Sequence, residues 1–177
     1  LEQYYWEKDS QKFYSECLSL ASVYKRASGY FRSTVFLVAL PEFIEFAKRG
    51  GKIYLVCSPE LSEEDINTME EGSRYRETFI LNKLDREFEK LIKEAKESDY
   101  HLKVLFTLIK CDVLKIKIAC LNRRGIYHEK LGVFEFNDNN VVSFIGSKNE
   151  TYSAWSDKGN YESIDVFASW IWFYYKR

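Results

Sequence analysis

The amino-acid sequence predicts a single α/β domain built on a mixed β-sheet. Two short apolar segments with strand character, residues 27–31 and 52–57, flank a helical segment, and this order predicts a parallel strand pair joined by a crossover helix. The last third alternates apolar and polar residues over 114–119 and 125–136, as half-buried strands do. The chain has 177 residues, of which 46% are hydrophobic, and this suits one compact core.

The first third of the chain predicts helices before and after the first strand. Residues 10–26 place apolar side chains at helical spacing, so we expect a helix there and a strand over 27–31. A second helix is expected from Ser33, a plausible N-cap, to residue 49. Pro41 interrupts that pattern and predicts a kink or two short helices.

The middle of the chain also has helical character. Ser62 is followed by three acidic residues, which is typical of the first turn of a helix. Residues 80–95 then carry an amphipathic pattern with one apolar face. The segment 102–110 fits either a helix or a strand, and we favour a helix.

The last third predicts a β-hairpin. The turn-forming sequence Asn-Asp-Asn-Asn over 137–140 separates the alternating segment 125–136 from a second apolar segment at 141–146. A final strand is expected over 163–167. The sequence therefore places several strands close together in the chain, where hairpin pairing can bring their ends into one site.

Composition and charge narrow the classes of function. The formal net charge is -1, so a basic footprint for nucleic acid is absent globally and could only be local. No apolar run is long enough to span a bilayer, and the first residues lack the pattern of a secretory signal. The four cysteines are not spaced as C-x-x-C and only two histidines occur, which argues against structural zinc and favours reduced thiols in a cytoplasmic protein.

The two ends suggest that residues 1–177 form one domain of a longer protein. The sequence begins without methionine and ends in the strongly apolar SWIWFYYKR. We therefore expect a further region to follow this domain and to pack against its aromatic tail.

The sequence His-Glu-Lys at 128–130 is the strongest candidate for chemistry. Alternate residues of a strand share a face, so His128 and Lys130 should point the same way. Hairpin pairing would bring them opposite Ser147 and Asn149, which follow the next strand. A nucleophilic or acidic imidazole, a fixed cation and two short polar groups together suit a phosphate diester.

These residues also resemble a known family. HEKLGVFE followed by GSKNETYSAW resembles the phospholipase D superfamily motif, H-x-K-x-x-x-x-D and then G-S-x-N. The matching positions are His128, Lys130, Gly146, Ser147 and Asn149. Glu135 stands where the family usually has Asp, so a catalytic carboxylate is expected there in a longer form.

The surrounding sequence resembles a nuclease branch of this superfamily. The segments SGYFRST, GGKIYLVCSPELSEED and NYESIDVF carry this resemblance. In that branch the domain often precedes a helicase-like ATPase in restriction or phage-defence proteins. The resemblance implies a mixed sheet flanked by helices on both faces, a DNA substrate and a C-terminal helicase-like ATPase region as partner.

The resemblance further implies a mechanism without a metal or other cofactor. One histidine attacks phosphorus to form a phosphohistidine, a second protonates the leaving oxygen, and lysines supply the positive charge. His101 is also followed by a lysine two residues on, but only His128 carries H-x-K together with the rest of the motif. We therefore expect a homodimer formed through the active-site face, in which His128 of a second copy completes the site.

Several further residues are weaker candidates. Glu162 or Glu150 could orient the imidazole, as a carboxylate does in a triad, or be a surface acid, and we favour Glu162. The expected phosphate or nucleic-acid contacts are Arg32, Arg123, Arg124 and Lys148. Each of these cations could equally lie on a solvated surface or serve local packing.

Three functions fit these observations. The first is a metal-independent DNA endonuclease. The second is a phosphodiesterase acting on a phospholipid or small diester, ranked lower because no amphipathic membrane segment is evident. The third is a non-catalytic module for dimerisation or nucleic-acid binding, which the change at Glu135 keeps open.

Overall fold

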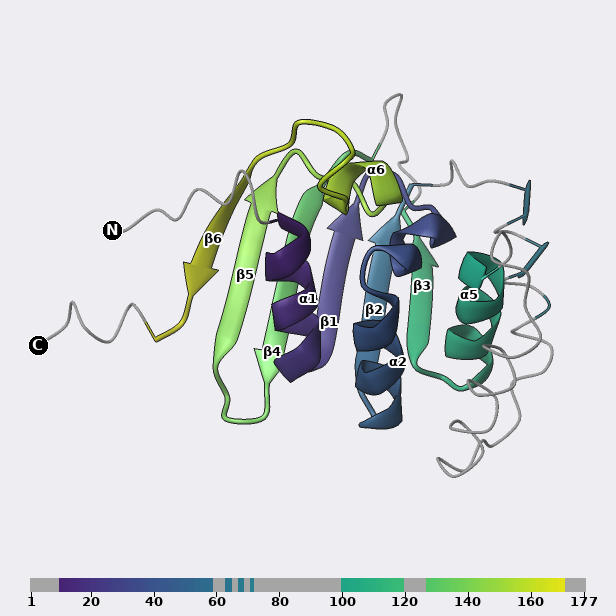
Figure 1. The fold of residues 1–177 in the computed structure, drawn as a ribbon, viewed down its shortest axis with the longest axis horizontal. Helices are drawn as coiled ribbons and strands as arrows, with labels where there is room; N and C mark the ends of the chain where they lie inside the picture. Colours follow the sequence, from purple (N-terminus) through teal and green to yellow (C-terminus); the bar gives the residue numbers. More distant parts are fainter. Residues whose placement is uncertain are drawn as a thin grey trace, which may run out of the picture.

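The computed structural model describes residues 10–58, 63–64, 67–68, 71, 100–119 and 127–170. These residues build a six-stranded mixed sheet in the order β3-β2-β1-β4-β5-β6 (Figure 1). The strands are β1 Ala21–Ser28, β2 Lys52–Cys57, β3 Leu114–Ile118, β4 Lys130–Phe136, β5 Val141–Gly146 and β6 Ile164–Ala168. β1, β2 and β3 are parallel, whereas β4, β5 and β6 join by antiparallel pairing. The predicted mixed α/β class is confirmed.

The helices of the described residues pack against one another beside one face of the sheet (Figure 1). They are α1 Ser10–Leu20, the 3-10 helix η1 Ser33–Leu37, α2 Leu40–Lys48, α5 Tyr100–Lys110 and the short α6 Tyr152–Trp155. Residues 80–95, with their amphipathic pattern, and Ser62 lie outside the described residues, whereas Glu63 and Glu64, which follow Ser62, are helical. In the part of the chain that the structure describes, no helix has the length and apolar character needed to cross a membrane.

The boundary between the first helix and the first strand differs from the sequence prediction. The helix ends at Leu20, six residues before the predicted end at residue 26, and β1 begins directly afterwards at Ala21. Ala21 and Tyr24 lie three residues apart, which continues the helical spacing of the preceding residues, so the local pattern favoured a longer helix. Tertiary pairing decides, because β1 lies in the centre of the sheet between β2 and β4.

Other predictions agree with the structure. Two short helices, η1 and α2, take the place of one, and Pro41 lies in the first turn of α2. Gly50 follows the end of α2 with a φ of 81°. The segment 102–110 is helical within α5. β4 and β5 form the predicted hairpin, with Asn139 in a left-handed conformation at its turn.

The core is built largely from aromatic rings on the helix-covered face of the sheet. Tyr24 of β1 stacks on Phe134 of β4, with ring centroids 4.4 Å apart and an interplanar angle of 8°. Tyr14 of α1 stacks on Trp155 of α6 at 4.4 Å. These four side chains are almost fully buried, so the rings lock helices α1 and α6 onto the two central strands.

Substitution of Gly132 by alanine should destabilise the fold, contrary to the usual effect in a strand. A Cβ at Gly132 would lie 2.0 Å from Cζ of Phe144, a ring that is 1% exposed and packs on Trp155. Overpacking of this kind costs about 1–3 kcal/mol, which urea denaturation of Gly132→Ala would measure. The same change in a Phe144→Leu background should cost less. An equal cost in both backgrounds would contradict the steric explanation.

Candidate active site

The chain segments that leave β1 and enter β4 lie side by side, where the C-terminal end of β1 meets the N-terminal end of β4. Ser28, the last residue of β1, is paired with Lys130, the first residue of β4. His128 therefore lies beside the loop that follows β1, where its ring meets the ring of Tyr30 edge-on at 6.0 Å. The Lys130 ammonium donates to the His128 carbonyl oxygen at 3.0 Å, which places the cation next to the exposed imidazole.

Asn149 reaches the same place from the loop that follows β5. Its Oδ1 accepts a hydrogen bond from the Tyr30 backbone N–H at 3.1 Å. A Cβ built on Gly29 would lie 2.9 Å from Cδ2 of His128 and 3.2 Å from Oδ1 of Asn149. The absence of a side chain at Gly29 thus lets the imidazole and the amide converge, and it leaves the Asn149 NH2 group as a donor for a ligand.

Ser147 and Glu162 form a second polar pair at this end of the sheet. The Ser147 hydroxyl donates to a carboxylate oxygen of Glu162 and accepts from the Ser163 N–H at 3.1 Å. Burial and the charge of Arg26 lower the pKa of Lys130, whereas the charge of Glu162 raises it. Glu162 is therefore within electrostatic reach of Lys130, and its role in orienting the imidazole stays a prediction.

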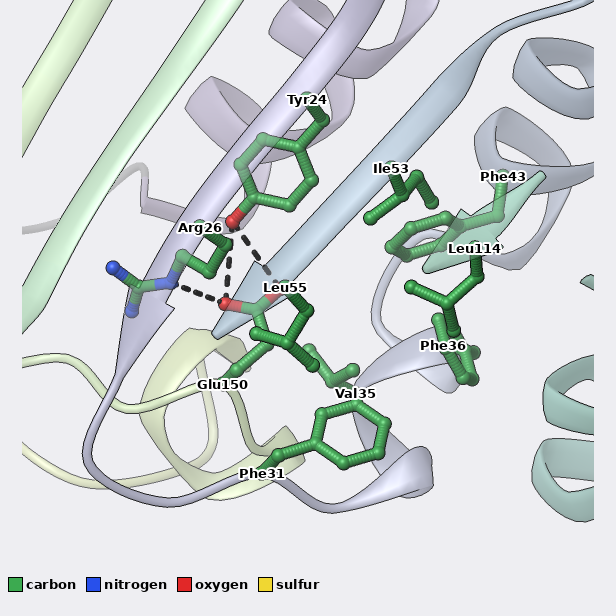
Figure 2. A pocket seen from close by; sticks show the side chains of 10 residues that line it. All are labelled: Tyr24, Arg26, Phe31, Val35, Phe36, Phe43, Ile53, Leu55, Leu114 and Glu150. Carbon is green, nitrogen blue, oxygen red and sulfur yellow. Dashed lines mark hydrogen bonds and ion pairs between the residues drawn. The ribbon is translucent and has the colours of Figure 1, made fainter. Parts of the chain in front are cut away.

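Glu150 lies beneath the site and serves a different purpose from orienting the imidazole. Its carboxylate accepts from the hydroxyls of Tyr14 and Tyr24, from Nε of Arg26 at 2.7 Å and from Nε1 of Trp155 at 3.3 Å. Figure 2 shows the contacts of Tyr24 and Arg26 with Glu150, at the end of a small cavity whose remaining lining is apolar. The residue is 3% exposed, so these four donors replace the water that an ionised carboxylate needs.

The loops on either side of the site are joined through the backbone of Glu150. Its N–H donates to the carbonyl oxygen of Tyr30 at 3.0 Å and to the Ser28 hydroxyl at 2.8 Å. Its carbonyl oxygen accepts from the Arg32 N–H at 3.0 Å, and a parallel bridge pairs Phe31 with Glu150. Residues 29–32 and 147–150 therefore form one connected unit.

Two predicted site residues lie elsewhere. Glu135 pairs with Lys25 on the face of the sheet opposite Lys130, roughly 17 Å along the strand from it, so it does not join the site. The motif spacing places Glu135 an odd number of residues from Lys130, which forces opposite faces. The Lys148 ammonium is buried, donates to the carbonyl oxygen of Ala154 and packs over the Trp155 ring, so a phosphate contact does not agree with its position.

Of the remaining predicted cations, the structure describes Arg32. Arg32 lies on the loop after β1 and donates from Nη1 to the Phe31 carbonyl oxygen at 2.9 Å. Arg123 and Arg124 lie outside the described residues. No cluster of His, Cys, Asp and Glu suited to a metal ion occurs within the described ranges.

Sequence reasoning missed three residues that shape the site, namely Arg26, Gly29 and Tyr30. Arg26 shares the inward face of β1 with Tyr24 and Ser28, and a charged residue at such a position requires a buried acid. That signal could have led from Arg26 to Glu150. For Gly29 and Tyr30, no local pattern separates a loop that packs against a histidine from an ordinary turn.

Comparisons with known proteins identify the fold. No family model matches the chain, and no curated protein does. NucT from Helicobacter pylori has a TM-score of 0.52 and 17% identity, covering 96% of this chain and 87% of its own. Nuc from Salmonella typhimurium, a phospholipase D family member, has a TM-score of 0.47 and 14% identity over 92% of this chain and 78% of Nuc. A mutant of the yeast tyrosyl-DNA phosphodiesterase has a TM-score of 0.49 and 11% identity, and the match covers 90% of this chain and 27% of the phosphodiesterase chain.

The similarity to NucT is one of fold, and the chain therefore has a phospholipase D-like α/β fold. The site described above lies where β1 ends and β4 begins, in the centre of that fold.

Replacement of Gly29 by alanine should disturb the site more than the fold. The added methyl group would press on the His128 ring and the Asn149 amide, so both side chains should move. We expect shifted 1H–15N resonances for the imidazole and the amide, with a smaller loss of thermal stability than in Gly132→Ala. Gly51→Ala, whose added Cβ would lie 2.4 Å from Cε1 of Phe46 on α2, is the matched control and should leave both resonances in place. Unchanged resonances in Gly29→Ala would contradict the proposed close approach.

Proposed function

We propose that this domain is a metal-independent phosphodiesterase, and specifically a DNA endonuclease that cleaves through a phosphohistidine at His128. The observation that carries the proposal is the convergence of His128 and Asn149 around Gly29, with Lys130 beside them. The H-x-K and G-S-x-N motifs fall on these same residues, and the phospholipase D-like fold supports the assignment.

The chemistry follows from the groups present. The His128 imidazole attacks phosphorus, a P–N bond forms, and the bond from phosphorus to the leaving oxygen breaks. Lys130 and the Asn149 NH2 group hold the non-bridging oxygens, where negative charge develops in the transition state. A second imidazole protonates the leaving oxygen and then removes a proton from the water that cleaves the P–N bond. Glu162, held by Ser147, is the carboxylate that we assign to orienting an imidazole.

The second imidazole should come from another copy of the chain. His101 is engaged on α5, where its Nδ1 lies 2.8 Å from the Ser33 hydroxyl. Lys103, two residues on, lies on the same helix, so the pair lacks the strand-like alternation expected of His128 and Lys130. His128 and Ser147 are both exposed, just before β4 begins and just after β5 ends, so a second copy can approach them. We therefore propose a two-fold homodimer through this face, in which each His128 serves both half-sites.

The substrate and the cellular setting belong to the same proposal. DNA binding would be local, because the net charge of the chain is -1. Arg32, Arg123 and Arg124 are the cations that we assign to backbone phosphates. The nuclease-branch resemblance supports a longer restriction or phage-defence protein in which a helicase-like ATPase region follows this domain.

Cleavage of plasmid DNA in the presence of excess EDTA tests the reaction directly. The parent domain should cleave, because lysine and asparagine supply the charge stabilisation that a metal would otherwise provide. His128→Ala should lose activity by at least about a thousandfold, since no nucleophile remains. His101→Ala is the matched control and should keep the cleavage activity of the parent.

Two results would contradict the nuclease assignment. Loss of cleavage on adding EDTA would argue for a metal-dependent mechanism. Tight DNA binding without cleavage by the parent would favour the non-catalytic module, and hydrolysis of phospholipid alone would favour the lipid-directed enzyme.

The shared site predicts a dominant effect of inactive subunits. Parent protein mixed with a roughly tenfold excess of His128→Ala subunits should lose most of its activity after subunit exchange, because most parent subunits then lack a partner His128. Sedimentation equilibrium should give a dimer for both proteins. A monomer with full activity would contradict the shared site, and so would unchanged activity per parent subunit in a confirmed mixed dimer.

A further inference from the structure

Arg26 and Glu150 form a buried ion pair directly beneath the candidate site. Their side chains are 1% and 5% exposed, whereas every other ion pair found among the described residues has both partners at least 31% exposed. Neither residue belongs to the H-x-K and G-S-x-N positions. The pair therefore needs an explanation of its own.

The carboxylate of Glu150 connects three secondary-structure elements. It receives hydrogen bonds from Tyr14 of α1, from Tyr24 and Arg26 of β1 and from Trp155 of α6. Burial raises the pKa of both tyrosines well above the ordinary value, and the Glu150 charge raises it further. Both hydroxyls consequently stay protonated at neutral pH and act as donors.

Arg26 fixes the loop on the other side of Asn149. Its Nη2 donates to the carbonyl oxygen of Lys148, while its Nε holds the Glu150 carboxylate. Asn149 is thus bracketed by two residues that are tied to one guanidinium group. The backbone bonds of Glu150 to Tyr30 and Arg32 join this bracket to the loop that packs on His128.

The pair also sets the charge beneath Lys130. Nη1 of Arg26 is buried and has no hydrogen-bond partner among the described residues. Burial and Arg26 lower the pKa of Lys130, while Glu162 and Glu129 raise it. Loss of the Glu150 charge would leave Arg26 uncompensated and would move the Lys130 pKa further down.

Stability alone is a weak reason to keep such a pair. The desolvation cost of two buried charges commonly matches or exceeds their attraction, and well-packed apolar residues can replace them without loss. Fixed geometry at a reacting centre is a stronger reason, because a small misplacement of a binding group costs much of the rate.

We infer that Arg26 and Glu150 are positioning residues that hold the Asn149 amide at the distance from His128 and Lys130 that phosphodiester cleavage requires. The inference rests on the proposed function for its kinetic consequences. Its geometric content, that the buried pair fixes the Asn149 side chain, stands independently of any activity.

The test compares Glu150→Gln and Tyr24→Phe with Val104→Ala, a buried residue of α5 that lies away from the pair. Steady-state hydrolysis of bis(p-nitrophenyl) phosphate is measured well below each unfolding temperature. Glu150→Gln should lower kcat on the order of a hundredfold with little change in KM, and Tyr24→Phe should lower it in the same direction but less. Val104→Ala should lose stability and keep kcat.

The pH profile separates positioning from general destabilisation. In Glu150→Gln the alkaline limb of kcat should move to lower pH, because the uncompensated Arg26 favours neutral Lys130. Val104→Ala should keep the parent profile. A folded Glu150→Gln protein with the parent kcat and pH profile would overturn the inference.

A second measurement covers the cases in which Glu150→Gln does not fold or the parent is inactive. The Asn149 side-chain amide is observed by 1H–15N spectroscopy in the parent, Tyr24→Phe and Val104→Ala, with and without inorganic phosphate. The amide resonance should move in Tyr24→Phe and stay in place in Val104→Ala. An unchanged resonance in Tyr24→Phe would overturn the inference. An inactive parent whose resonance moves as expected would overturn only the proposed function.

Discussion

The buried ion pair of Arg26 and Glu150 is the constraint on which the rest of the site depends. A charged residue on the inward face of a central strand must find an opposite charge, because unpaired burial of either group is prohibitively costly. The partner comes from a loop more than a hundred residues further along the chain, and its position is completed by two tyrosines and a tryptophan from α1, β1 and α6. The hydrogen bonds that compensate one buried charge therefore fix the positions of α1 and α6 and of both site loops relative to one another.

The two-residue period of β-strands decides which side chains can take part. Lys130 lies on the helix-covered face with Ser28 as its neighbour, whereas Glu135, five residues on, lies on the other face and pairs with Lys25. Position in a motif and position in space thus differ for the carboxylate. Glu162 lies on a different segment from Lys130, so the alternation of β4 does not set its position. Its carboxylate accepts a hydrogen bond from Ser147, which follows β5.

The resulting site is open on one side. His128 and Ser147 are exposed, while Arg26 and Glu150 are buried beneath the loops that carry the site, so the chain presents a half-site to whatever approaches the ends of β1 and β4. Gly29 contributes by leaving space, since any side chain there would separate the imidazole from the Asn149 amide. This arrangement suits a large phosphate diester or a second copy of the chain better than an enclosed small molecule.

The sequence by itself determined the mixed α/β class, the hairpin of β4 and β5 and the division of the helix near Pro41. It also proposed His128, Lys130, Ser147 and Asn149 as the candidate site. These features follow from local periodicity, turn chemistry and motif spacing, which act over a few residues. Tertiary structure alone decided where α1 gives way to β1, because the helical spacing continues past Ala21 and only pairing with β2 and β4 makes this segment a strand. It also decided that Lys148 turns inward and that Glu150 lies beneath the site. The first outcome depends on packing against Trp155 of α6, and the second on the buried Arg26 of β1, far back in the chain; no local pattern records either partner.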